Sequence, residues 1–393
     1  MIYLDNAATT AVRRQVLEAM WPYLTEEYGN PSSHHSLGEQ AARALAGARE
    51  RVASALGCAP GEIIFTSGGT ESDNLAIKGI ALASPRGRHL VTTAIEHEAV
   101  LESCDYLVRH HGFEVTIVGV DHEGRVDAAA VASALRPDTT LVSVMLANNE
   151  VGTVQPVAEI AAATTAVGAR MHSDAVQAAG WLPLDVRALG VDALTISGHK
   201  LGAPKGVGAL YLRRGVRAEP LVHGGGQERG RRSGTENVAG AVGLATALEL
   251  GEAARLASAG EITRLRDRFI GAMLREVPGA ILTGDREARL PSNASFCFPG
   301  TSGEAVLLDL ERRGIVCSSG SACAAGSDEP SHVLVAMGVD DAVAQTAVRF
   351  TLAEATTAEE LDQAVTAVRD TVAGLGVLSP AGRAVRSDGR SLR

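Results

Sequence analysis

Short apolar runs alternate along the chain with longer stretches whose apolar residues recur at helical spacing. Runs rich in Val, Ile, Leu and Thr predict strands, and the stretches between them predict helices. The expected strands are 63–66, 89–93, 114–118, 141–146, 169–172, 193–196 and 208–212, with helices over 71–83, 97–109, 127–135 and 156–167. Strands joined by helical crossovers predict an α/β fold, with a mainly parallel, seven-stranded sheet and helices on both of its faces.

The pattern changes on either side of this region. Two helices are expected before the first strand, over 14–27 and 37–56, and a long helical stretch ends near residue 276. Beyond it, short strands are expected at 296–298, 314–316 and 347–351. We therefore predict a large domain over 14–255 and a smaller α+β domain over 256–378. Residues 379–393 combine four arginines with Gly, Ser and Pro, so a mobile tail is expected there.

A single lysine, Lys200, follows the apolar run 193–196 after the residues Ser-Gly-His. Open α/β sheets bind ligands at the carboxyl ends of their strands, so this lysine is expected in a crevice. Partial desolvation would lower the pKa of its amine and make it a nucleophile or a base. The ordinary alternative is a solvated surface lysine, and other motifs decide between the two.

Two other segments favour a cofactor site. Asp174 closes the run before that of Lys200, and the segment 67–71 (SGGTE) follows the strand expected at 63–66. Glycines and hydroxyls that open a helix after a strand can hold a phosphate with backbone N–H groups. A lysine that can form a Schiff base, with an aspartate that can pair with a pyridinium nitrogen, is the arrangement that holds pyridoxal phosphate.

With these residues in place, the chain resembles the cysteine desulfurases, pyridoxal phosphate enzymes of the class V aminotransferase group. The resemblance rests on five motifs in order: 3–10 (YLDNAATT), 70–74 (TESDN), 197–200 (SGHK), 232–235 (RSGT) and 318–323 (SSGSAC). It extends from residue 2 to about residue 370. It implies the type I fold of PLP-dependent transferases, with residues 1–13 in the small domain. It also implies L-cysteine as substrate, a sulfur-acceptor protein as partner, and a homodimer with shared active sites.

The resemblance assigns roles to individual residues. Lys200 carries the cofactor and shuttles a substrate proton, His97 stacks on the cofactor ring and assists proton transfer, and Asp174 keeps the ring nitrogen protonated. The other expected cofactor contacts are Gly69, Thr70, Asn149, Gln177, Ser197, His199 and, from the second subunit, Thr235. Arg349 is expected to grip the substrate carboxylate with its planar guanidinium. Asn30 lies in a turn-forming loop at the mouth of the site and is expected to contact the substrate.

Cys323 would separate a desulfurase from other enzymes that use the same cofactor. Its neighbours are small residues, which suits a mobile loop rather than the packing of a buried thiol. Its thiolate would attack the substrate sulfur and then carry the persulfide out of the site. The following segment, to Ser331, resembles the long-loop branch of the family, which delivers sulfur directly to partner proteins. Cys317 is expected to be structural.

Composition narrows the classes of function. The chain has 393 residues and a formal net charge of −10, so direct binding of nucleic acid is not expected. The N-terminus lacks a signal core and no apolar run reaches the length of a membrane span, so we expect a cytoplasmic protein without membrane attachment. Five scattered cysteines without CxxC pairs indicate reduced thiols, and neither a disulfide framework nor a metal site.

Two other functions stay open at this point. One is a selenocysteine lyase or another β-lyase on the same fold, and the other is a catalytically silent sulfur carrier or scaffold. The chain also departs from the family at 353–355, where Ala-Glu-Ala replaces the usual Gly-Arg-Phe, and in a tail without acidic and aromatic docking residues. The acceptor is open among an iron–sulfur scaffold, a tRNA-thiolation relay, DNA sulfur modification and a natural-product pathway.

Overall fold

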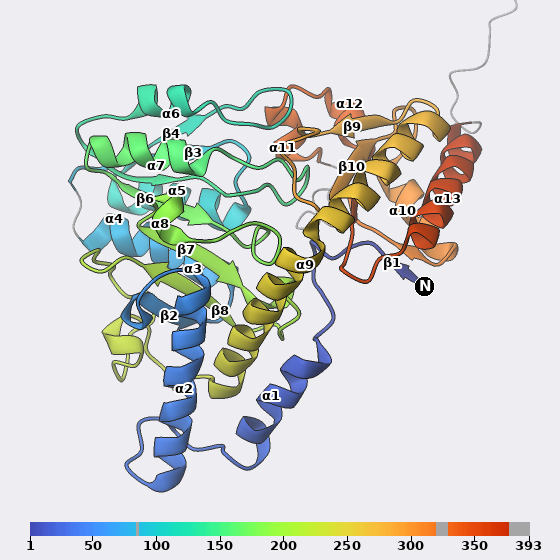
Figure 1. Ribbon diagram of the computed structural model, residues 1–393. Helices are drawn as coiled ribbons and strands as arrows, with labels where there is room; N and C mark the ends of the chain where they lie inside the picture. Colours follow the sequence, from blue (N-terminus) through green and yellow to red (C-terminus); the bar gives the residue numbers. More distant parts are fainter. Residues whose placement is uncertain (84–85, 320–328, 377–393) are drawn as a thin grey trace, which may run out of the picture.

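The computed structural model of the protein describes residues 1–83, 86–319 and 329–376 (Figure 1). Its central sheet has seven strands in the order β2-β8-β7-β6-β5-β3-β4. Only β8 runs antiparallel to its neighbours, β2 and β7, so the predicted mainly parallel sheet is confirmed. In chain order the strands are β2 (Ile63–Thr66), β3 (His89–Thr93), β4 (Glu114–Val118), β5 (Thr139–Ser143), β6 (Arg170–Asp174), β7 (Ala193–Ser197) and β8 (Gly208–Leu212).

Three central strands differ from their predicted bounds, β7 only by one residue at its end. The apolar run 141–146 continues beyond β5 because residues after Ser143 still pair with the adjacent strand, β6. The Leu146 N–H, for example, donates to the carbonyl of Asp174 at 2.8 Å. β6 ends at Asp174, two residues later than the prediction. Asp174, the carboxylate expected to contact the cofactor, is therefore the last residue of a strand, and the hydrogen bonds between strands fix its backbone.

Alternate residues of the central strands enter two separate hydrophobic cores, as a sheet covered on both faces requires. Ile63 and Phe65 lie in one core, and Ile64 lies in the other. The first core is closed by α1 (Arg14–Thr25), α2 (Ser36–Ala55), α6 (Ala128–Ala134), α7 (Val157–Ala166) and α8 (Val186–Leu189). The second is closed by α5 (Glu98–His111) and by one broken helix, which consists of α3 (Gly69–Asn74), a π-helical turn (Leu75–Gly79) and α4 (Ile80–Ala83).

The helix α9 (Val238–Glu276) joins the two parts of the molecule as a single 39-residue rod, visible across the centre of Figure 1. Its first half, with Leu244 and Leu248, packs in the core of the large sheet. Its second half, with Phe269 and Met273, packs in a separate core. This division of apolar contacts supports a domain boundary near residue 255, which stays a prediction.

The smaller part contains a three-stranded antiparallel sheet in the order β12-β10-β9 and a parallel pair, β1 with β11. Its aromatic core includes Phe269 and Phe350, whose ring centroids lie 5.4 Å apart in an edge-on arrangement. The elements are β1 (Ile2–Tyr3), β9 (Ile281–Thr283), β10 (Asn293–Cys297), α10 (Gly303–Arg312), β11 (Ile315–Val316), α11 (His332–Ala336), α12 (Asp341–Ala344), β12 (Ala347–Thr351) and α13 (Ala358–Gly376). The pairing of β1 with β11 supports the placement of the N-terminal residues with the small domain.

The described ranges contain no helix with the length and apolar character needed to cross a membrane. The predicted mobile tail, 379–393, lies outside the described residues.

Candidate active site

A cleft of about 550 Å³ opens at the carboxyl ends of the central strands, against residues of the small domain. Most residues that the motifs predicted for the site line this one cleft. They are Gly69, Thr70, His97, Asn149, Asp174, Gln177, Ser197, His199, Lys200 and Arg349. All but Arg349 come from the ends of five strands of the central sheet or from the segments that follow them, and Arg349 comes from the middle of β12. The fold, and not proximity in the sequence, therefore brings them together.

Lys200 lies one tight turn beyond β7. The turn is closed by the Leu201 N–H, which donates to the carbonyl of Gly198 at 2.9 Å. The Gly198 N–H donates to the carbonyl of Val207 at 3.0 Å, and a Cβ on Gly198 would lie 3.0 Å from the Val207 side chain. The amine donates hydrogen bonds to the carbonyls of Ala7 and Ala8, the latter at 2.7 Å. The N-terminal segment therefore holds the Lys200 amine at the floor of the cleft.

Asp174 faces the cleft from β6, the strand next to β7, in register with Thr195. Its side chain is buried, and its Oδ1 accepts a hydrogen bond from the Val176 N–H at 2.8 Å. Burial is the largest influence and raises the pKa of Asp174 above its ordinary value, although the Val176 N–H and the nearby His97 and Lys200 oppose this rise. A buried carboxyl group at this position is suited to pair with a protonated ring nitrogen, whose positive charge would favour the ionised form of Asp174.

The residues around Lys200 and Asp174 fit pyridoxal phosphate. Backbone can approach a phosphate closely only where side chains are missing, and a Cβ on Gly69 would lie 2.9 Å from a methyl group of Val176. Burial, with smaller contributions from Lys200 and Lys205, lowers the pKa of His199 to about 4, so its ring is neutral at pH 7. A neutral ring still carries one N–H donor for a phosphate oxygen. Thr70 and Ser197, which also line the cleft, add hydroxyl groups as further donors.

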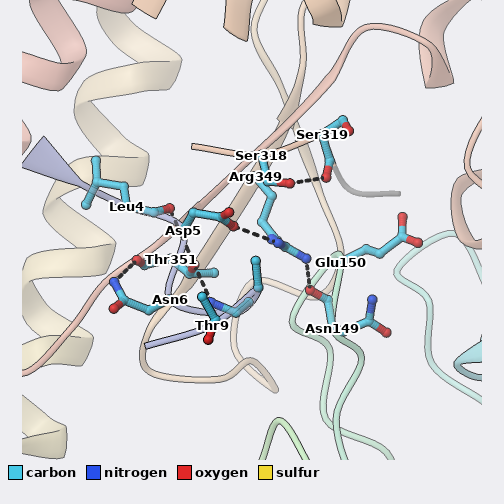
Figure 2. A network of polar contacts seen from close by, with 12 residues as sticks. Leu4, Asp5, Asn6, Thr9, Asn149, Glu150, Ser318, Ser319, Arg349 and Thr351 are labelled. Carbon is cyan, nitrogen blue, oxygen red and sulfur yellow. Dashed lines mark hydrogen bonds and ion pairs between the residues drawn. The ribbon is translucent and has the colours of Figure 1, made fainter. Parts of the chain in front are cut away.

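Arg349 lines the cleft from β12 of the small domain, and Figure 2 shows its contacts with Asp5 and Asn149. The residue is 2% exposed. Its Nη1 donates to the carbonyl of Asn149 at 2.8 Å, and its Nη2 donates to Asp5 Oδ1 at 2.9 Å. Its backbone is paired with Ser318 in both directions. A guanidinium held in this way presents a fixed cation at the side of the cleft, as a carboxylate-binding residue must.

Comparison with known proteins agrees with this geometry. Residues 2–364 match the aminotransferase class-V family. A cysteine desulfurase of Trichormus azollae is 49% identical over 381 residues, which cover 97% of this chain and 95% of that protein. The cysteine desulfurase IscS of Dictyoglomus turgidum is 47% identical over 380 residues, or 96% of each chain. A solved structure titled NifS-like protein has a TM-score of 0.89 at 41% identity and covers 95% of this chain and 100% of its own.

The chain belongs to the cysteine desulfurases of the aminotransferase class-V family. The resemblance seen in the sequence is thereby confirmed, and with it the type I fold and the cysteine desulfurase activity. The individual roles assigned to its residues stay predictions.

Two predicted site residues that the structure describes do not line the cleft of this desulfurase. Thr235 and Asn30 are both exposed, Thr235 on the loop before α9 and Asn30 in the turn before α2. Asn30 Oδ1 accepts a hydrogen bond from the Ser32 N–H at 2.9 Å, which stabilises the turn itself. Cys323 lies outside the described residues.

The four described cysteines of the desulfurase are poor nucleophiles. Burial raises the pKa of Cys58, Cys104 and Cys317 to about 12 and that of Cys297 to about 11, so all four are protonated thiols at neutral pH. Only a thiolate attacks sulfur efficiently. Their environments are those of structural thiols, which supports the prediction made for Cys317.

Sequence reasoning gave no role to several acidic residues at the cleft. Asp73 lines it and is 1% exposed, and burial together with the charge of Asp174 raises its pKa well above the ordinary value. Asp73 Oδ1 lies 3.6 Å from His172 Nε2 and has no hydrogen-bond partner among the described residues. An acid within a helix usually faces water, so the motif gave no signal of its burial. Asp5 was missed as well, although it lies in the first motif.

Proposed function

We propose that this desulfurase binds pyridoxal phosphate at Lys200 and converts L-cysteine to L-alanine, leaving the sulfur as a persulfide on Cys323. The observation that supports this most strongly is the convergence of Lys200, Asp174 and Arg349 on one cleft. They supply an amine for the cofactor, a carboxylate for its ring nitrogen and a cation for the substrate carboxylate. An acceptor protein would then take the sulfur from Cys323.

Each side chain has a defined task in this proposal. Bound pyridoxal phosphate supplies an electron-withdrawing ring that stabilises negative charge at the substrate carbon. Lys200 removes and returns the proton at the substrate Cα, and Asp174 holds the proton on the ring nitrogen. His97 covers the ring face and assists proton transfer. The phosphate contacts come from Gly69, Thr70, Ser197 and His199, and the contacts to the ring oxygen come from Asn149 and Gln177.

Sulfur leaves the substrate by attack of the Cys323 thiolate on the substrate sulfur. The new S–S bond forms as the bond between that sulfur and the substrate Cβ breaks, and the carbon fragment keeps the electron pair. Proton uptake at this carbon yields alanine, so one thiol and one cysteine give one persulfide and one alanine. No external oxidant or reductant is needed.

We expect the purified enzyme to release L-alanine in a 1:1 ratio to the L-cysteine consumed. A β-lyase that expels sulfide by elimination would instead release pyruvate and ammonia, and a silent carrier would release neither. Amino-acid analysis and a coupled pyruvate assay of the same reaction measure both products. Pyruvate as the main product would reject the proposed sulfur transfer.

We further propose a homodimer in which Thr235 reaches the cofactor phosphate of the partner subunit. The loop that carries Thr235 is held by two ion pairs. Arg49 donates two hydrogen bonds of 2.7 Å to Glu228, and Arg232 donates a hydrogen bond of 2.9 Å to Glu71. Glu228 has a φ of 48° and Arg229 has a φ of 60°. Such backbone strain is kept where the surroundings hold it for a purpose. A rigid loop that exposes Thr235 supports contact with a second subunit.

Mixed dimers test this sharing. Thr235→Ala should make the cofactor dissociate about fivefold faster, the effect of about one lost hydrogen bond. We expect a heterodimer of Thr235→Ala and Lys200→Ala subunits to hold one cofactor with wild-type retention, since one mixed site carries both lesions and the other carries none. Retention as poor as that of the Thr235→Ala dimer would place Thr235 in its own subunit's site.

We also propose that the protein works in the cytoplasm, where reduced thiols persist. Its odd number of cysteines supports this location. Finding the protein in the membrane or periplasmic fraction of lysed cells would contradict it.

A further inference from the structure

The guanidinium of Arg349 is held by a carboxylate that belongs to the N-terminal segment. Nη2 donates to Asp5 Oδ1 at 2.9 Å, and the two groups form an ion pair whose arginine is almost completely buried (Figure 2). We propose that Asp5 is a positioning residue for the substrate carboxylate, which it serves by fixing Arg349 in the orientation that binds this carboxylate. The inference rests on the role proposed above for Arg349.

The hydrogen bonds of Arg349 leave room for a ligand. A guanidinium carries five N–H groups, and those used here are one on Nη1, toward Asn149, and one on Nη2, toward Asp5. The buried Nε has no hydrogen-bond partner within the described residues. Two anchors on different nitrogens fix the plane of the group, and the remaining N–H groups can form the paired hydrogen bonds that a carboxylate accepts.

Asp5 itself is held in place by its neighbours along β12. Thr351 N–H donates to the Leu4 carbonyl at 2.7 Å, and the Asn6 side chain donates to the Thr351 carbonyl at 2.8 Å (Figure 2). The Ala7 N–H donates to the Thr351 hydroxyl at 2.9 Å. Residues 4–7 are thereby hydrogen-bonded to the strand that carries Arg349, so the backbone of Asp5 keeps a fixed position relative to that strand.

The same segment reaches the catalytic lysine. The carbonyls of Ala7 and Ala8 accept hydrogen bonds from the Lys200 amine, two and three residues after Asp5. Residues 5–8 therefore contact both Arg349, which would bind the substrate carboxylate, and Lys200, whose amine would act at the adjacent Cα.

Charge gives a second reason for the pair. A guanidinium buried to this extent needs a counter-charge, because an isolated buried ion is strongly disfavoured. Asp5 supplies the counter-charge before substrate arrives. Without it, Arg349 would turn toward other acceptors or toward water, and each substrate molecule would have to reorient it on binding.

The decisive variant is Asp5→Ala in the holoenzyme. We expect the Kd for L-alanine, followed by the change in cofactor absorbance, and the KM for L-cysteine each to rise about tenfold, with kcat changed less than twofold. Cysteamine, which has the same amine and thiol but no carboxylate, should bind as it does to the wild type. Equal weakening of cysteamine, or unchanged affinity for L-alanine, would overturn the inference.

A double-mutant cycle separates this inference from the role of Arg349. Arg349→Gln alone should weaken L-alanine binding strongly, and adding Asp5→Ala to it should weaken binding no further. If Arg349→Gln has no effect, the proposed role of Arg349 fails. If it has the expected effect but the two substitutions act additively, Arg349 keeps its role and Asp5 does not act through it.

Two further variants guard against a folding defect. Asp5→Asn keeps an oxygen that can accept from Nη2, so we expect it to fold and to weaken L-alanine binding about threefold, again without effect on cysteamine. Asp362→Ala removes the carboxylate of another arginine pair, with Arg268, on the exposed surface. It should leave both affinities unchanged, and an effect as large as that of Asp5→Ala would show that the loss is not specific to the cleft.

Discussion

Replacing Lys200 with alanine is expected to leave a folded protein that carries no covalently bound cofactor and makes alanine at least about a thousandfold more slowly. Two functions would be lost together, the attachment of the cofactor and the base at the substrate Cα, and a positioned base alone contributes 10²- to 10⁴-fold. Borohydride reduction followed by peptide mapping measures the attachment, and circular dichroism checks the fold.

The composition of the chain makes this mapping unambiguous. It contains only three lysines, Lys78, Lys200 and Lys205. Lys78 donates to Asn74 and lies over the ring of Tyr106, and Lys205 is exposed just beyond the turn of Lys200. Lys205→Ala is therefore the matched control and should keep both the cofactor and the activity. Cofactor fixed to Lys205 or Lys78 in the Lys200→Ala protein would refute the assignment.

Replacing Cys323 with serine should spare cofactor binding and substrate binding but stop sulfur transfer. The hydroxyl of serine is not ionised at neutral pH and cannot take a sulfur atom, so we expect less than about one hundredth of wild-type alanine production. The change in cofactor absorbance on addition of L-cysteine should persist, because Lys200, Asp174 and Arg349 are intact.

The other cysteines supply the controls for this variant. The thiols of Cys58, Cys104, Cys297 and Cys317 are protonated at neutral pH because burial raises their pKa values. Replaced singly by alanine, each should leave substantial activity. Normal alanine production by Cys323→Ser, or its loss in Cys317→Ala with an intact fold, would contradict the proposed mechanism.

The sequence alone allowed much of the cleft to be predicted, and the reason lies in the fold. In a parallel sheet the strand ends share one edge, so polar residues that close successive apolar runs, such as Asp174 and Lys200, must come close together. The segment 67–71 supplied Gly69, and the family resemblance supplied His97 and Arg349; all three line the cleft. Bounds were less certain where an apolar run extends beyond its strand, as it does after Ser143.

What sequence reasoning missed depends on contacts without a local signature. Ala7 and Ala8 contact Lys200 through backbone carbonyls, which every residue carries, so their side chains give no sequence signal of this contact. The pair of Asp5 with Arg349 joins residues at opposite ends of the chain, and it becomes visible only once β12 lies beside the N-terminal segment. Thr235 is exposed in the single chain, so its role depends on a partner subunit.

Mass spectrometry after brief exposure of the enzyme to L-cysteine tests the central claim most directly. Trypsin leaves Cys317 and Cys323 on one peptide, 314–349, so fragment ions must locate the added mass. The account predicts one added sulfur atom on Cys323, formed together with one alanine per active site and absent from the Lys200→Ala protein. Sulfur located on Cys317, or alanine formed with no sulfur added to this peptide, would contradict it.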